Sequence, residues 1–112
     1  MFIYSYMDAI MNDSTFIPIS DEIAGRLAEL FRALGDPSRV RMIAVLAGGE
    51  ASVSHLAELA GISESSASHH LRGLRLMRLV RARKHGRQVF YSLDDDHIAH
   101  LFRGSLDHIL HD

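Results

Sequence analysis

The 112-residue chain contains no cysteine and no tryptophan, and only two of its residues are prolines. Without cysteine the protein has no disulfides, no thiolate chemistry and no cysteine-based metal site. The chain also lacks a Gly-rich phosphate loop, a nucleophile elbow and a His-Glu-x-x-His run, which are recurrent signatures of catalytic sites. These absences predict a protein that is not an enzyme and has no small-molecule substrate.

Lysine and arginine are absent from residues 1–20, which are apolar in patches and are interrupted by Asp8 and Asp13. This pattern predicts neither a signal peptide nor a membrane span, so we expect a cytoplasmic protein with no membrane partner. We interpret residues 1–20 as an N-terminal extension, partly helical and packed at a dimer interface, and residues 21–112 as one domain. A core built from 112 residues is marginal, and dimerisation would enlarge it.

Charge is distributed unevenly, although the net charge is only −2. Seven of the 12 Lys and Arg residues fall between Arg72 and Arg87, where no Asp or Glu occurs, and five of the 14 acids lie in residues 94–112. A basic block of this kind can be a solvated helix face. Contact with nucleic acid is the stronger interpretation, because a local patch matters more than the total charge.

Helix start signals divide the chain into segments. Four residues with the side chains of helix N-caps stand directly before helical patterns: Ser20, Asp36, Ser52 and Ser63. They predict helices over residues 21–34, 37–47, 53–60 and 64–77, with Gly61–Ser63 as a tight joint between the last two. Alternating apolar residues around the turn at residues 84–87 then predict a β-hairpin, and a terminal helix spans about residues 94–112. This order predicts a mainly α fold with a small β-hairpin, the winged helix-turn-helix.

The predicted helix over residues 64–77 has a small, polar face near its start, formed by Ser65, Ser68, His69 and Arg72. A recognition helix needs short hydrogen-bonding side chains where it enters the major groove, and flanking cations to meet phosphates. The predicted hairpin adds three cations where a wing would reach the DNA backbone or the minor groove: Arg83, Lys84 and Arg87. Together these seven residues predict binding to double-stranded DNA.

Three segments carry a family resemblance: LGDPSRVRMIAVL (34–46), VSHLAELAGISESSASHHLRGLRLMRLV (53–80) and GRQVFYSL (86–93). Over roughly residues 22–112 the chain resembles the ArsR/SmtB family of bacterial metal-sensing repressors. The resemblance implies a bacterial, homodimeric repressor that binds operator DNA and is released by its inducer. Ser52 stands where the family's helix-three site has cysteine, and this departure excludes the arsenic, lead and cadmium thiolate subtypes.

The last 19 residues, DDDHIAHLFRGSLDHILHD, combine four histidines with five aspartates. His97 and His108 are eleven residues apart, which places them within about 20° of one helix face but about 16 Å apart along the axis. Zn–N bonds are about 2 Å long, so one helix cannot bring both imidazoles to one ion. His108 and His111 can share an ion, and so can His97 and Asp95 if Asp95 caps the helix.

A second copy of the terminal helix resolves this separation. In an antiparallel pair, His97 opposite His108 of the second copy and Asp95 opposite its His111 have midpoints of about 102.5 and 103, which is one register. A two-fold axis near residues 102–103 then gives two intersubunit sites per dimer. A solvated polar helix end remains the alternative.

The same four positions resemble the family's C-terminal-helix zinc and cobalt site. One carboxylate and three neutral imidazoles form a closed tetrahedral set, as expected for Zn²⁺. Co²⁺ and Ni²⁺ remain open, with His100 as an auxiliary ligand. Zinc is favoured because the family's nickel sensors use N-terminal residues, and this tail has no histidine.

The sequence therefore predicts a repressor that binds operator DNA as a metal-free homodimer and is released when Zn²⁺ binds between the terminal helices. The alternative is a winged-helix regulator of the same family that does not sense metal and answers another inducer or none.

Overall fold

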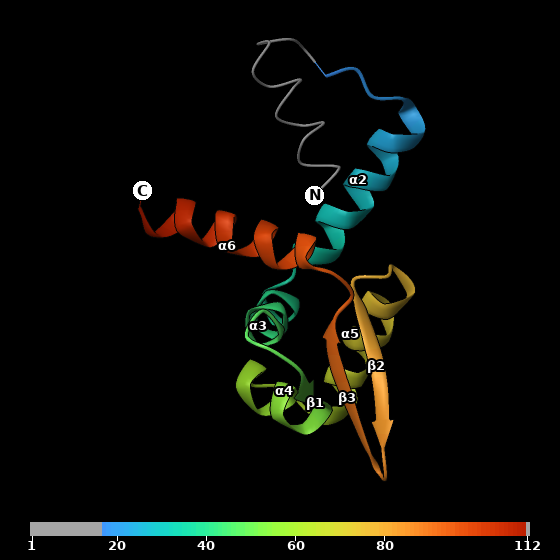
Figure 1. The fold of residues 1–112 in the computed structure, drawn as a ribbon, viewed down its shortest axis with the longest axis vertical. Coiled ribbons are helices and arrows are strands. Elements are labelled where there is room, and N and C mark those ends of the chain that lie inside the picture. Colours follow the sequence, from blue (N-terminus) through green and yellow to red (C-terminus); the bar gives the residue numbers. More distant parts are fainter. Residues whose placement is uncertain (1–16, 112) are drawn as a thin grey trace.

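The computed structural model describes residues 17–111 and contains five helices and three strands in that range. In chain order they are α2 (Asp21–Leu34), α3 (Pro37–Leu46), β1 (Ala51–Ser52), α4 (Val53–Ala60), α5 (Glu64–Leu76), β2 (Val80–His85), β3 (Gln88–Leu93) and α6 (Asp96–Leu110). Figure 1 shows α3, α4, α5 and the sheet gathered into one body, from which α2 and α6 extend in different directions. The predicted winged helix-turn-helix is confirmed.

The helix starts follow the predicted caps. Side-chain oxygens of Ser20, Asp36, Ser52 and Ser63 each accept a hydrogen bond from the backbone N–H three residues later, at 3.2, 3.0, 3.2 and 3.0 Å. Gly61 ends α4 in the left-handed conformation with a φ of 71°, which a residue with a Cβ adopts only with strain. This glycine makes the short joint between α4 and α5.

The sheet contains one strand more than the predicted hairpin. Strands β2 and β3 pair antiparallel around a two-residue turn, with His85 opposite Gln88 and the first turn residue, Gly86, at a φ of 61°. Strand β1 pairs with the other side of β3, so the order is β1-β3-β2. A two-residue strand is too short to produce an alternating pattern in the sequence.

The core lies in the body of the molecule. Its five largest fully buried side chains come from α3, α4, α5 and β2: Met42, Leu56, Leu71, Leu74 and Val80. In contrast, α2 contributes only Ala33 to the buried residues, and α6 contributes only Ile98 and Ala99. Both long helices therefore leave apolar side chains exposed.

Among the described residues, no helix is long and apolar enough to cross a membrane. The expected partly helical extension falls mainly on residues 1–16, which lie outside the described residues, as does Asp112.

Candidate DNA-reading face and metal centre

Helix α5 separates its buried face from its polar face as the sequence predicts. Ala67, Leu71 and Leu74 are 0% exposed and fix the helix against the core. Of the predicted DNA contacts, Ser65, His69 and Arg72 are exposed and Ser68 is half-buried. The polar face is therefore presented to solvent by a helix that cannot rotate without exposing its leucines.

The hairpin brings one predicted wing cation next to this helix. A polar recess of about 270 Å³ lies between the starts of α4 and α5 and the turn of the wing, and Ser68 and Arg87 both line it. Ser52 and Ser54 supply hydroxyls to the same recess, and Glu64 supplies a carboxylate. Lys84 is exposed on β2, one residue before its end. The structure thus brings Ser68 and Arg87 together, which the sequence alone places nineteen residues apart.

Arg83, the third predicted wing cation, forms an exposed ion pair with Glu50. Its Nε and Nη2 donate to the two carboxylate oxygens of Glu50 at 3.0 and 2.8 Å, and its guanidinium lies 5.0 Å from the ring centroid of Phe90 on the paired strand. These hydrogen bonds hold the pKa of Glu50 below its ordinary value and raise the pKa of Arg83. Arg83, which is predicted to contact DNA, thus also links the wing to the segment before β1.

No local sequence pattern indicates this pair, because Glu50 lies 33 residues before Arg83. A second long-range contact involves His70, which is not among the predicted site residues. His70 is half-buried, and its Nδ1 accepts a hydrogen bond from Arg39 Nε at 3.0 Å.

The first predicted metal half-site is assembled at the start of α6. Asp95 is the N-cap, and its Oδ1 accepts from the backbone N–H of His97 at 2.9 Å. The same oxygen lies 3.2 Å from His97 Nδ1. The condition that Asp95 caps the helix is therefore met, and a carboxylate and an imidazole lie side by side.

The second half-site lies at the other end of the same helix. His108 is in the last turn of α6, and His111 is its C-cap. The imidazole Nδ1 of His111 lies 3.0 Å from Asp107 Oδ1 and 2.9 Å from the Asp107 carbonyl oxygen. Asp107 is not among the predicted site residues, although its i,i+4 spacing to His111 is a signal for this contact. His100, the auxiliary ligand in the prediction, is exposed in the first half of α6.

Within residues 17–111 of a single chain, no group of three or more His, Asp or Glu side chains is close enough to hold a metal ion. The two half-sites are separated by the length of one continuous helix, Asp96–Leu110. The donor set, one carboxylate and three imidazoles, suits Zn²⁺ only if a second chain supplies the other half.

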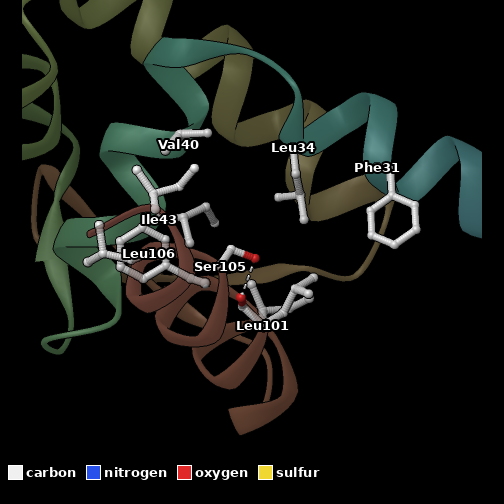
Figure 2. Close-up of a pocket in the computed structure, with 10 residues that line it drawn as sticks. Phe31, Leu34, Val40, Ile43, Leu101, Ser105 and Leu106 are labelled. Atoms are coloured by element: carbon white, nitrogen blue, oxygen red, sulfur yellow. Dashed lines mark hydrogen bonds between the residues drawn. The ribbon is translucent and has the colours of Figure 1, made fainter. Parts of the chain in front are cut away.

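An apolar groove of about 350 Å³ lies where α2, α3 and α6 meet. Figure 2 shows Phe31 and Leu34 of α2, Val40 and Ile43 of α3, and Leu101 and Leu106 of α6 around it. The one hydroxyl in the lining, Ser105, donates to the Leu101 carbonyl at 2.8 Å, so its polar group is satisfied within the helix. The groove therefore presents an apolar surface with no unsatisfied side-chain hydroxyl in its lining.

Comparisons with known proteins agree with this architecture. The family model for bacterial regulatory proteins of the arsR family matches residues 36–82. A solved homodimeric winged helix-turn-helix DNA-binding domain from Mycobacterium bovis superposes with a TM-score of 0.70 at 28% identity, covering 87% of this chain and 96% of that one.

Two sequence relatives are regulators. The chain is 49% identical over 86 residues to a transcriptional repressor SmtB homolog of Synechocystis sp., covering 77% of this chain but only 65% of the relative. It is 40% identical over 83 residues to the cadmium resistance transcriptional regulatory protein CadC homolog of Staphylococcus aureus, covering 73% of this chain and 69% of the relative. This likeness to regulatory proteins confirms the prediction that the chain is not an enzyme. The chain belongs to the ArsR family of bacterial regulatory proteins.

Proposed function

We propose that the protein is a homodimeric transcriptional repressor that binds operator DNA in its metal-free form and is released by Zn²⁺ bound between two copies of α6. The observation that carries the proposal is the position of the two half-sites. Asp95 and His97 start the helix, whereas His108 and His111 end it. Each pair supplies only two of the four ligands that the ion needs. An antiparallel second copy of the helix would supply the other two at each site.

The exposed faces of the two long helices support the dimer. Leu101 and Leu106 are 36% and 42% exposed on α6, and Phe31 is 56% exposed on α2. Gly104 lies seven residues after His97, which places it within about 20° of the histidine face. No other group lies within 4 Å of where its Cβ would be, so two copies of the helix can approach closely there.

DNA binding is supported by the polar face of α5 and by the recess that it shares with the wing. Ser65, Ser68, His69 and Arg72 would meet the major groove, and Lys84 and Arg87 would meet phosphates. In a dimer, the two copies of this DNA-binding surface would lie at a fixed separation and contact successive turns of the duplex. Closing the metal sites would change that separation, because the same helices set the dimer geometry.

Zinc is proposed over Co²⁺ and Ni²⁺ because four protein ligands of this kind form a closed tetrahedral set. The staphylococcal relative is named for cadmium resistance, whereas this chain has no cysteine thiolate with which to bind cadmium. Asp95, His97 and the partner copy's His108 and His111 would hold the ion. If Zn²⁺ weakens the affinity for DNA by some factor, bound DNA must weaken the affinity for Zn²⁺ by the same factor.

The proposal is tested on a DNA duplex selected from a random pool with the metal-free protein. Zn²⁺ is titrated into the labelled complex, and anisotropy reports the affinity for DNA. We expect DNA affinity to fall by about 10-fold or more, within the usual range of coupling free energies. Unchanged or tighter binding would exclude induction by zinc. Calorimetry that finds no saturable Zn²⁺ binding, or binding indifferent to His97→Ala, would favour the regulator that does not sense metal.

A further inference from the structure

Arg39 connects three helices through one side chain. It lies in the first turn of α3, where its backbone N–H donates to Asp36 Oδ2 at 3.0 Å. Its Nη1 donates to the carbonyl oxygen of Ala33 in the last turn of α2 at 3.3 Å. Its Nε donates to Nδ1 of His70 on α5 at 3.0 Å. One half-buried guanidinium therefore ties α2 and α3 to the helix proposed to read DNA.

The guanidinium also packs on the backbone of α5. A Cβ on Gly73 would lie 3.3 Å from Arg39 Nη2, so the missing side chain provides the space that the guanidinium occupies. His70 and Gly73 are three residues apart and lie on one flank of α5, between its buried leucines and its polar face. The neighbouring His69 belongs to that polar face, and its ring lies 6.1 Å from the His70 ring, edge to face.

The direction of the hydrogen bond fixes the protonation state of His70. Arginine stays charged and has no acceptor, so Nδ1 of His70 must accept and its proton must lie on Nε2. A protonated imidazole has no acceptor atom, and it would place a second cation 3.0 Å from Arg39 Nε. The contact can exist only while His70 is neutral.

Other charged groups near the pair come from each packed element. Asp36 of α3 bonds to the Arg39 backbone, and His69 of α5 faces the His70 ring. Glu29 and Arg32 of α2 line a recess together with Arg39. Asp36, Glu29 and Arg32 lie near Arg39, whereas His69 lies against His70. The direct hydrogen-bond partner of the His70 ring is the guanidinium.

We propose that Arg39 and His70 are a positioning pair that sets the recognition helix relative to α2, and that protonation of His70 releases it and weakens DNA binding. This inference rests on the proposed DNA binding. It also gives a route by which α2, whose exposed face is proposed to support the dimer, acts on α5. Under this proposal the affinity for DNA falls as the pH falls, and the effect does not require a metal ion.

The main test compares wild type with His70→Gln and His70→Ala in a chelator at constant ionic strength. Glutamine keeps an acceptor for Arg39 but does not titrate, whereas alanine removes the acceptor. Anisotropy with the selected duplex is measured from about pH 8 to about pH 5.5, the range in which histidines change charge. Because the other histidines are shared, the ratio of wild-type to His70→Gln affinity isolates residue 70.

We expect wild type and His70→Gln to bind DNA alike at the upper pH, and wild type to become about tenfold weaker than His70→Gln at the lower pH. His70→Ala should be about tenfold weaker than wild type already at the upper pH. Parallel pH profiles for wild type and His70→Gln, or full affinity of His70→Ala, would overturn the proposal.

A measurement on the free protein separates this inference from the proposed function. Nitrogen NMR of the His70 ring should show the tautomer with the proton on Nε2, and Arg39→Lys should redistribute the two tautomers. A mixture of tautomers in wild type would overturn the positioning pair even if DNA binds. Failure of wild type to bind DNA at every pH would overturn the proposed function and the effect on DNA, while the tautomer would still report on the pair.

Discussion

The body of the molecule and its two long helices bury their side chains to very different extents. The body, residues 37–93, supplies all five of the largest fully buried side chains. Of the 12 large hydrophobic side chains that are exposed within the described residues, seven lie on α2 or α6. The proposed DNA-reading face is therefore built on a core that one chain completes, whereas the proposed metal sites lie on a helix that still needs a partner.

This difference follows from how the two regions close. Helices α3, α4 and α5 and the sheet cover one another in the body, so their apolar faces meet within one chain. Helix α6 touches the body near its start, through Ile98 and Ala99, and Arg103 Nη2 donates to the Ala47 carbonyl oxygen at 2.7 Å. Beyond that point Ile109 and Leu110 are 68% and 70% exposed. The two regions should respond to mutation in different ways.

Leu71→Ala should give the largest effect, because Leu71 is 0% exposed in the core of the body. Removing its side chain is expected to lower the free energy of unfolding by about 2–5 kcal/mol. Denaturant unfolding followed by circular dichroism measures the loss, with exposed Leu76→Ala as the control on the same helix. Equal losses for the two variants would contradict the assignment of the core to the body.

His97→Ala should act on metal binding and leave the body intact. Loss of one of four proposed ligands is expected to weaken Zn²⁺ binding by roughly 100-fold or more, beyond the 10–100-fold typical of outer-shell changes. Competition with a chromophoric chelator measures the affinity. His100→Ala is the matched control on the same helix, and an equally large effect of His100→Ala would point to a different ligand set.

Ile109→Asp should weaken the dimer, because Ile109 lines the apolar groove and is not needed by the core. A charge on this surface is expected to raise the dimer dissociation constant by about 10-fold or more. Leu110→Asp is the control, since Leu110 is equally exposed but is not part of the groove lining. Sedimentation equilibrium distinguishes them, and identical behaviour would mean that the groove is not covered by a second copy.

Arg87→Ala should weaken DNA binding and reduce the slope of log affinity against log salt by about 0.9, as expected for one lost phosphate contact. Arg83→Gln combined with Glu50→Gln should leave that slope nearly unchanged, because Arg83 is engaged by Glu50. Anisotropy over a range of salt concentrations gives both slopes. An equal fall in the double variant would show that DNA displaces Glu50 from Arg83.

Glu50→Gln should give the smallest effect, since both partners of this ion pair are exposed. The hydrogen bonds from Arg83 lower the pKa of Glu50 from its ordinary 4.5. The contribution to stability is therefore present above about that pH and is lost as the pH falls through the lowered pKa in the folded state. Unfolding of wild type and variant should converge in acid, and a difference that grows in acid would reverse the sign of the coupling.

Much of the local architecture was predictable because its causes lie within a few residues. The Ser63 hydroxyl caps α5 by accepting a hydrogen bond from the backbone N–H three residues later. Gly61 adopts the left-handed conformation that ends α4, and glycine does so without steric strain. The position of Asp95 at the start of α6 likewise follows from helix chemistry at that point. The intersubunit arrangement of the metal ligands remains a prediction, because its other half lies on another chain.

The sequence by itself determined the helices, the tight joint, the wing and the spacing of His97 and His108, since hydrophobic period, caps and turns act over three or four residues. Only the tertiary structure decided that Arg83 faces Glu50, 33 residues away, and that Arg39 reaches His70, 31 residues away. The physical reason is that a charged side chain pairs with whichever group the fold of the chain places within about 3 Å of it. No local pattern specifies that path, so neither the Arg83–Glu50 contact nor the Arg39–His70 contact could be predicted from the sequence.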